Sequence, residues 1–207
     1  MQKVSENKWK EVLRSCGVLP QVAEDWALCF SEFFDGSLFS AGDKELVPFL
    51  ANIIHESQRL SKYEESLYYT AERMVKVWPT RFPTVESAKP YEKNPRMLAG
   101  RVYGNRLGNK TLNDSWEFRG SGLIMITGRD NFEFIEKQIH LPVSTQPDLL
   151  RHPGPTALAA ALAWWEGKVP DSVIGDTART RAKVNGGDIG LVDVTSLTST
   201  LSKASLL

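Results

Sequence analysis

The stretch Leu46-Val-Pro-Phe-Leu-Ala-Asn-Ile-Ile-His-Glu56-Ser57 decides the fold of this chain. Its apolar residues recur at helical spacing and predict a helix that turns one face toward a core. Glu56 stands three residues after Ile53 and seven after Phe49, so at 3.6 residues per turn it continues this apolar stripe. A carboxylate on a buried face is costly unless it is paired, hydrogen-bonded or neutral. The alternative is a helix-end Glu56 that turns out to water, and the helix alone leaves both interpretations open.

Length and composition place the chain among soluble globular proteins. Its 207 residues suffice for one large domain or two small lobes, and 42% of them are hydrophobic against 24% charged. The formal charge of zero and the pI of about 6.8 lack the basic excess typical of nucleic-acid binding. The polar residues 1–10 do not form a signal peptide, and no apolar run is long enough for a membrane span. We therefore expect a cytoplasmic monomer without nucleic-acid partner, membrane insertion, metal or cofactor.

Two helical patterns precede the central helix, over residues 5–15 and 20–33. With the central helix they form the base of one helical lobe. Asp43 is the expected N-cap of the central helix, and Pro48 is expected to kink that helix or to delay its start. Cys16 and Cys29 lie at the apolar faces of the first two patterns, and in a reducing cytoplasm two buried free thiols are favoured over a disulfide.

The segment after Glu56 carries a second glutamate, Glu65. In an unbroken helix, nine residues correspond to a rise of about 13 Å and to the opposite face. We therefore expect the helix to end near Ser57 and a loop or short extended strand to run through residues 65–69. This path would fold Glu65 back across a cleft toward Glu56. Helix is expected to resume over residues 70–77.

Prolines and glycines divide the rest of the chain. Four prolines fall between residues 79 and 95, which predicts a loop-rich smaller lobe over about 79–109. The remaining residues, about 1–78 and 110–207, are expected to form the helical main lobe of a single catalytic domain, 1–207. Further helices are predicted at 96–103, 129–139, 155–165, 177–184 and in the tail from 191, and a short β-like run is predicted after Gly122.

Several chemistries are excluded by spacing. His55-Glu56 lacks the second His four residues on that a zinc-binding helix needs, since position 59 is Arg59. No Ser-His-Asp or Cys-His set is evident, and the glycines near residue 120 match neither a dinucleotide fingerprint nor a phosphate loop. What remains is a pair of carboxyls in unlike settings, Glu56 after an apolar helix and Glu65 among polar neighbours. Such a pair is the minimal apparatus of glycoside hydrolysis.

Five motifs in order resemble the chitinase-like family 19 glycoside hydrolases, most closely the bacteriophage endolysin branch. They are His55-Glu56-Ser57, Glu65-x-Leu67-x-Tyr69, Asn105-Arg-Leu-Gly-Asn109, Arg119-Gly-x-Gly-Leu-Ile-x-Ile-Thr-Gly128 and Asn185-Gly-Gly187, within about residues 8–190. The resemblance implies a mainly α, lysozyme-like, two-lobed fold with a small β hairpin or short strands beside the cleft. It also implies an inverting enzyme that cleaves the glycan strand of peptidoglycan.

The resemblance also implies roles for single residues. Glu56 is the expected general acid, Glu65 the base that activates water, and Thr127 a residue that holds this water. The expected substrate-binding residues are Ser57, Tyr69, Asn105, Arg119, Gly122, Ile126 and Asn185. An endolysin of this kind acts on the periplasmic cell wall after a separate membrane-permeabilising protein releases it from the host cytoplasm.

The chain departs from the family pattern at several positions. Ser121 replaces an Arg between the two glycines, and Met125 replaces a Gln before Ile-Thr. Gln58 and Arg59 replace glycines common after His-Glu-Ser, and the arginine-rich helix often seen after Asn-Gly-Gly is missing. Some alternatives stay open: Glu65 as a solvated loop residue, Thr127 as a helix cap and Asn185 as a turn residue. The alternative functions are a bacterial chitinase and an inactive glycan-binding module, although retention of both glutamates argues against the module.

Overall fold

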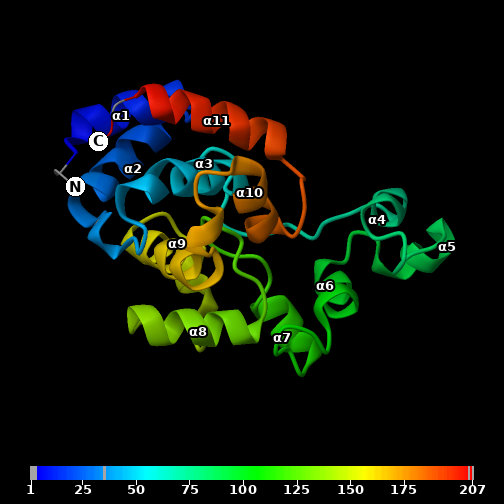
Figure 1. Ribbon diagram of the computed structural model, residues 1–207. Coiled ribbons are helices and arrows are strands. Elements are labelled where there is room, and N and C mark those ends of the chain that lie inside the picture. The colour runs from blue at the N-terminus through cyan, green and yellow to red at the C-terminus, as the bar shows by residue number, and fades with distance from the viewer. Residues whose placement is uncertain (1–3, 35, 205, 207) are drawn as a thin grey trace. The chain divides into compact units, whose positions relative to one another are not determined.

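The computed structural model describes residues 4–34, 36–204 and 206, and it is mainly helical, as predicted. The chain divides into two compact units (Figure 1). Unit 1 comprises Met1–Tyr63, Gly122–Met125 and Asp148–Leu207, and unit 2 comprises Glu64–Ser121 and Ile126–Pro147. The chain therefore passes between the units at Tyr63, directly before Glu64 and Glu65.

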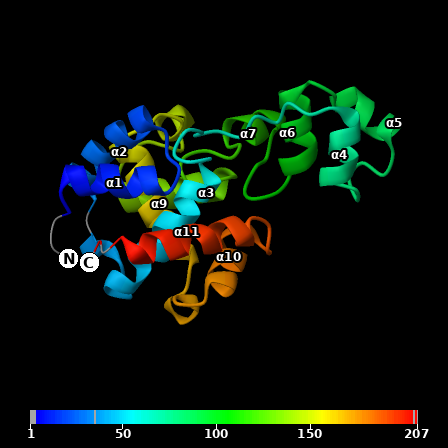
Figure 2. The same ribbon diagram turned by 90° about the horizontal axis from the view of Figure 1, so that it is seen from above.

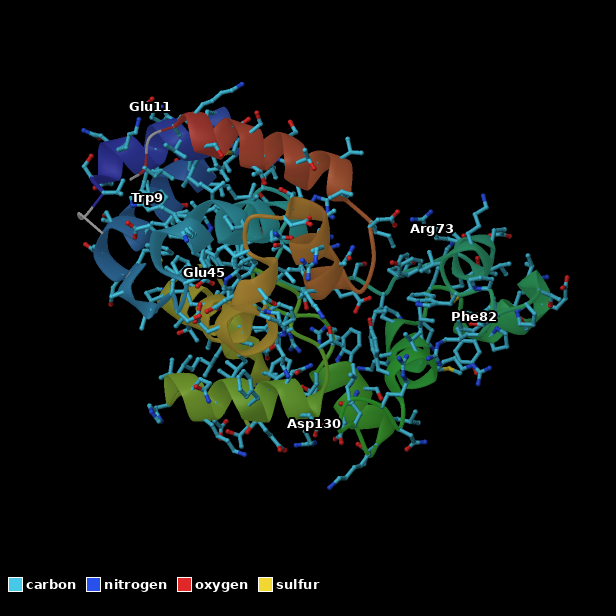
Figure 3. The ribbon with its side chains drawn as sticks, viewed as in Figure 1. Trp9, Glu11, Glu45, Arg73, Phe82 and Asp130 are labelled. Atoms are coloured by element: carbon cyan, nitrogen blue, oxygen red, sulfur yellow. The ribbon has the colours of Figure 1, made fainter. Side chains whose placement is uncertain are left out.

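Helices from the two ends of the chain lie in unit 1. They are α1 (Glu6–Ser15), α2 (Pro20–Phe33), α3 (Leu46–Glu56), α9 (Pro155–Lys168), α10 (Thr177–Asn185) and α11 (Leu191–Lys203), with 3-10 turns η1 (Gly36–Leu38), η2 (Gly42–Glu45) and η5 (Asp171–Val173). The expected pair of N-terminal helices is confirmed. α1 and α2 pack through Trp9 and Phe30, both 1% exposed, whose ring centroids lie 4.9 Å apart (Trp9 is labelled in Figure 3).

Helix α3 is the centre of unit 1. Phe49 is fully buried and packs edge-on against Trp165 of α9, while α11 lies alongside α3 (Figure 2). The helix ends at Glu56, as predicted, but the expected Asp43 cap is wrong. η2 leads directly into α3, and Glu45, buried at the junction, accepts hydrogen bonds from Ala41 N at 2.6 Å and from Trp165 Nε1 at 2.6 Å. These bonds fix the start of α3 without a side-chain cap.

The remaining helices lie in unit 2, which has its own core. They are α4 (Ala71–Val77), α5 (Val85–Ala88), η3 (Lys89–Tyr91), α6 (Pro95–Tyr103), α7 (Leu112–Glu117) and α8 (Arg129–Ile139); η4 (Pro147–Leu150) spans the boundary with unit 1. Thr70 caps α4 and Asn94 caps α6, with Pro95 in its first turn, as predicted. The short helices α5 and α7 were not predicted.

The core of unit 2 explains why its limits differ from the expected smaller lobe. The lobe of residues 79–109 lies inside unit 2, but the buried cluster also draws on residues before and after it. Its members are Leu67, Ala71, Met74, Phe82, Ala88, Leu98, Ala99 and Val102, with Trp116 packed against them (Phe82 is labelled in Figure 3). Because α4 and Leu67 share this core, the unit begins at Glu64.

β-structure within the described residues is limited to isolated bridges, Glu64 with Ser121 and Ser121 with Ile126. These bridges stand where the sequence predicted a hairpin or short strands. Cys16 and Cys29 are buried free thiols, as expected, and burial raises the pKa of Cys29 to about 11. None of the helices formed by the described residues has the length and apolar character needed to cross a membrane.

Candidate functional site

Glu56 ends α3 with its carboxyl group turned inward. Its side chain is 19% exposed, and Oε1 lies 2.6 Å from Nη1 of Arg181, which is buried on α10. The contact is an ion pair without hydrogen-bond geometry, since Glu56 Oε1 is buried and accepts no hydrogen bond. Of the two interpretations left open by the sequence, the structure shows the paired carboxylate and not one turned out to water.

Arg181 is the residue of this region that the sequence analysis missed. Its Nη1 donates to Asn52 Oδ1 at 3.1 Å, and its Nε donates to the carbonyl oxygen of Ile189 at 2.8 Å. The arginine therefore joins α3, α10 and the loop before α11 around the Glu56 carboxylate. In the sequence it is one of several charged residues in a polar helix, so no local pattern distinguishes it from a solvated one.

Ser57 has a structural role in the turn after α3, and its expected substrate contact stays a prediction. Its side chain is fully buried; Oγ donates to the carbonyl oxygen of Ile53 at 2.5 Å and accepts from Leu60 N at 3.0 Å. Because this buried hydroxyl both donates and accepts a hydrogen bond, it stabilises the turn that follows α3. This turn directly follows Glu56.

In unit 2, Glu65 is held by the backbone and by a tyrosine. Its N–H donates to the carbonyl oxygen of Gly120 at 2.8 Å, and Tyr103 Oη donates to Oε1 and Oε2 at 2.9 and 2.7 Å. Burial and the neighbouring Glu65 carboxylate raise the pKa of Tyr103 far above its usual range, so the phenol stays a donor. Glu65 is thus a fixed carboxylate and not a solvated loop residue. No local pattern in the sequence pointed to Tyr103.

Thr127 faces Glu65 across Gly120. A Cβ atom added to Gly120 would lie 3.4 Å from Glu65 Oε2 and 3.5 Å from Thr127 Oγ1. The missing side chain of Gly120 therefore leaves both oxygens turned toward one small space. Thr127 does not cap the following helix, because the N-cap of α8 is Gly128, without a side-chain bond. This arrangement within unit 2 is suited to holding a water molecule beside Glu65.

Two expected substrate-binding residues of unit 2 are accessible. Asn105 is exposed and adopts a positive φ of 54° in the loop after α6. Tyr69 is half-buried and packs against Trp78 with tilted rings whose centroids lie 5.1 Å apart, and burial and the Glu65 carboxylate raise the pKa of Tyr69. The same loop is anchored by Asn109, which donates to the carbonyl oxygen of Tyr103 at 3.1 Å and accepts from Arg129 N at 3.0 Å. Asn109 therefore fixes the loop that presents Asn105.

The expected substrate contacts of Arg119 and Ile126 are not supported, because both side chains are buried, 7% and 1% exposed. Arg119 stacks on Trp116, 4.0 Å from its ring centroid, and pairs with Glu64. Ile126 instead exchanges backbone hydrogen bonds with Ser121, at 3.0 and 2.8 Å. These residues hold the segment on which Gly120 and Thr127 stand.

Gly122 and Asn185 lie in turns of unit 1. Gly122 has a φ of 75°, which glycine adopts without strain, and donates its N–H to the carbonyl oxygen of Tyr63 at 2.8 Å. Asn185 accepts from Gly187 N at 2.9 Å and donates to the carbonyl oxygen of Ile189 at 2.6 Å. Its amide therefore holds the turn after α10, and its substrate contact stays a prediction.

The departures from the family pattern are accommodated locally. Ser121 is fully buried, and its Oγ donates to the carbonyl oxygen of Arg119 at 2.8 Å. Met125 has a positive φ of 52° in the turn between the bridged residues. Among the residues the structure describes, no three His, Cys, Asp or Glu side chains gather in a way that could hold a metal ion.

Comparisons with known proteins identify the family. No protein-family model matches the sequence. A protein of Haemophilus influenzae described as a glycosyl hydrolase family 19 domain-containing protein is 32% identical over 146 residues, which cover 69% of this chain and 71% of the relative. The chain belongs to glycoside hydrolase family 19.

Solved structures agree with this assignment at the level of the fold. This family 19 glycoside hydrolase resembles chitinase C from Streptomyces griseus HUT6037 with a TM-score of 0.53 at 15% identity, covering 98% of this chain and 76% of the other. It also resembles a mutant of chitinase C, with a TM-score of 0.56 at 15% identity, covering 98% and 92% of the two chains. The expected lysozyme-like helical fold is therefore confirmed, and the chain is a glycan-hydrolysing enzyme.

Proposed function

We propose that this glycoside hydrolase is an endolysin that cleaves the glycan strand of bacterial peptidoglycan. The observation that carries the proposal is the pair of glutamates in unlike, fixed environments. Glu56 is buried beside Arg181, whereas Glu65 accepts from Tyr103 and faces Thr127 across Gly120. The order of the five motifs, which resembles the endolysin branch, supports peptidoglycan as the substrate.

The proposed mechanism is single-step inversion. Glu56 donates a proton to the glycosidic oxygen as the bond to the anomeric carbon breaks. Glu65 takes a proton from a water molecule whose oxygen attacks that carbon from the opposite face, and Thr127 helps to orient this water. Each turnover leaves Glu56 ionised and Glu65 protonated, and exchange with solvent restores both. Asn105 and Tyr69 are the proposed sugar contacts in unit 2, and Asn185 and Gly122 those in unit 1.

A lysis assay tests the substrate. Outer-membrane-stripped Gram-negative cells and chitin oligosaccharides are treated with the wild type, Glu56→Gln, Glu65→Gln and the exposed control Glu86→Gln. The proposal expects lysis by the wild type and the control and a loss of at least about a hundredfold in both site variants. Cleavage of chitin without lysis would support the chitinase alternative, and glycan binding without any cleavage would support the inactive module.

Two further questions are which glycosidic bond the enzyme cleaves and how it reaches the cell wall. Mass spectrometry of digested peptidoglycan shows whether the new reducing end is muramic acid or glucosamine. For the route, we propose release from the host cytoplasm to the cell wall through a separate membrane-permeabilising protein. Expression in the bacterial cytoplasm is therefore expected to leave cells intact until the membrane is permeabilised, whereas lysis without permeabilisation would contradict this route.

A further inference from the structure

Asp193, near the start of α11, contacts the chain on both sides of Glu56. Its Oδ2 lies 2.6 Å from His55 Nδ1, and Arg59 donates from Nη1 and Nη2 to Oδ2 and Oδ1 at 2.9 and 2.6 Å. Two parallel bonds between guanidinium and carboxylate fix orientation as well as distance. One carboxylate of the C-terminal helix therefore holds the residue before Glu56 and a residue three positions after it.

The segment held by Arg59 is strained. Gln58, Arg59 and Leu60 have consecutive positive φ values of 49°, 63° and 59°. A left-handed conformation costs about 1–2 kcal/mol for each residue with a Cβ atom, so three in a row persist only where the surroundings fix them. Leu60 is fixed by burial, but Gln58 is exposed. Arg59 is fixed at two points: its N–H donates to the carbonyl oxygen of Ile54 at 2.7 Å, and its guanidinium pairs with Asp193.

The start of α11 also confines the His55 ring. Gly190, the N-cap of α11, has a φ of 81°, and a Cβ atom added there would lie 2.1 Å from His55 Nε2. His55 Nδ1 is therefore paired with Asp193, and the Nε2 side of the ring occupies the space that a side chain at position 190 would fill.

We propose that Asp193 is a positioning residue for Glu56, so that α11 belongs to the catalytic apparatus. The proposal rests on the proposed function, in which Glu56 is the general acid. Asp193 holds the strained turn behind Glu56 and the ring before it, which fixes where α3 ends and where the acid points. The neighbouring Arg59 lowers the pKa of Asp193 to about 2, so the carboxylate stays charged at any working pH.

Kinetics of Asp193→Asn test this role. We expect kcat to fall about tenfold or more and KM to stay within about twofold, because a small displacement of an acid is costly only at the chemical step. Asp188→Asn, an exposed control ahead of α11, is expected to leave both values unchanged. In a Gln58→Gly background the turn is less strained, so the loss caused by Asp193→Asn is expected to shrink at least about threefold.

Arg59→Lys provides a second route if Asp193→Asn does not fold. It keeps the charge but removes the paired bonds, and it is expected to lower kcat about threefold without changing KM. Unchanged kcat in a folded Asp193→Asn or Arg59→Lys enzyme, or an equal loss in the Gln58→Gly background, overturns the positioning role alone. An active Glu56→Gln enzyme overturns the proposed function instead.

Discussion

Removing the hydroxyl of Tyr103 isolates the contribution of unit 2 to catalysis. In Tyr103→Phe, Glu65 loses the hydroxyl that lies 2.9 and 2.7 Å from its two carboxylate oxygens. The phenol has one proton, so the two distances describe a single shared bond. A hydrogen bond to a charged group contributes about 1.5–3 kcal/mol, and water replaces part of this. We therefore work with a net loss of about 1.4 kcal/mol, which corresponds to about one pH unit.

The sign follows from which form of Glu65 the bond favours. Tyr103 donates to the ionised carboxylate, so its loss makes the base easier to protonate. The acidic limb of the profile of kcat/KM against pH is therefore expected to move about one unit toward higher pH. The activity near the optimum is expected to fall only a few-fold, because the base is still ionised there.

The assay measures kcat/KM on a soluble glycan substrate from pH 4 to 9. Tyr91→Phe is the matched control, because Tyr91 packs on Phe82 in the same unit at 5.3 Å between ring centroids and is not placed at Glu65. Thermal unfolding of both variants shows whether the fold is retained. The reasoning is refuted if a folded Tyr103→Phe enzyme keeps the acidic limb of the wild type, or if Tyr91→Phe shifts it equally.

Four further predictions concern single residues or the product. Glu56→Gln should keep the fold by circular dichroism and lower the lytic rate about a hundredfold or more, and a near-normal rate contradicts the acid assignment. Glu64→Gln should cost a few-fold in rate and lower the melting temperature, because Glu64 pairs with the buried Arg119; matching the exposed control Glu86→Gln would contradict this. Time-resolved proton NMR should show the α anomer first from a β-linked substrate, and a β product first excludes inversion. The folded-state pKa of Asp193, about 2, lies below its ordinary 3.8, so its contribution to stability should be present above about pH 4 and disappear toward pH 2. In denaturant unfolding, Asp193→Asn should therefore lose less stability between pH 4 and pH 2 than the wild type does.

Local sequence patterns predicted the elements well. The caps Thr70 and Asn94, the end of α3 at Glu56 and the inward face of α11 follow from short-range chemistry, and each is present. The failed Asp43 cap shows the limit of this reasoning. Glu45 starts the helix because Trp165, distant in the chain, binds its carboxylate. A long-range hydrogen bond of this kind leaves no mark on the local pattern.

The residues that contact the two glutamates could not be predicted from the sequence for the same reason. Arg181 and Tyr103 lie far along the chain from Glu56 and Glu65, and neither stands at a spacing that one helix or turn would impose. The burial of the Ser57 and Arg119 side chains was not foreseen, because a motif gives residue identity but not exposure. Ser57 stabilises the turn after Glu56, and Arg119 pairs with Glu64, the residue before Glu65.

Each glutamate is held by residues of its own unit. Glu56 depends on Arg181 and, through its flanking residues, on Asp193, whereas Glu65 depends on Tyr103 and the backbone of Gly120. In a two-carboxyl mechanism, the acidic limb of the pH profile reports the base and the alkaline limb reports the acid. Tyr103→Phe should therefore move the acidic limb. Because the contacts described for the acid lie in unit 1 and those described for the base lie in unit 2, Tyr103→Phe tests the base separately from the acid.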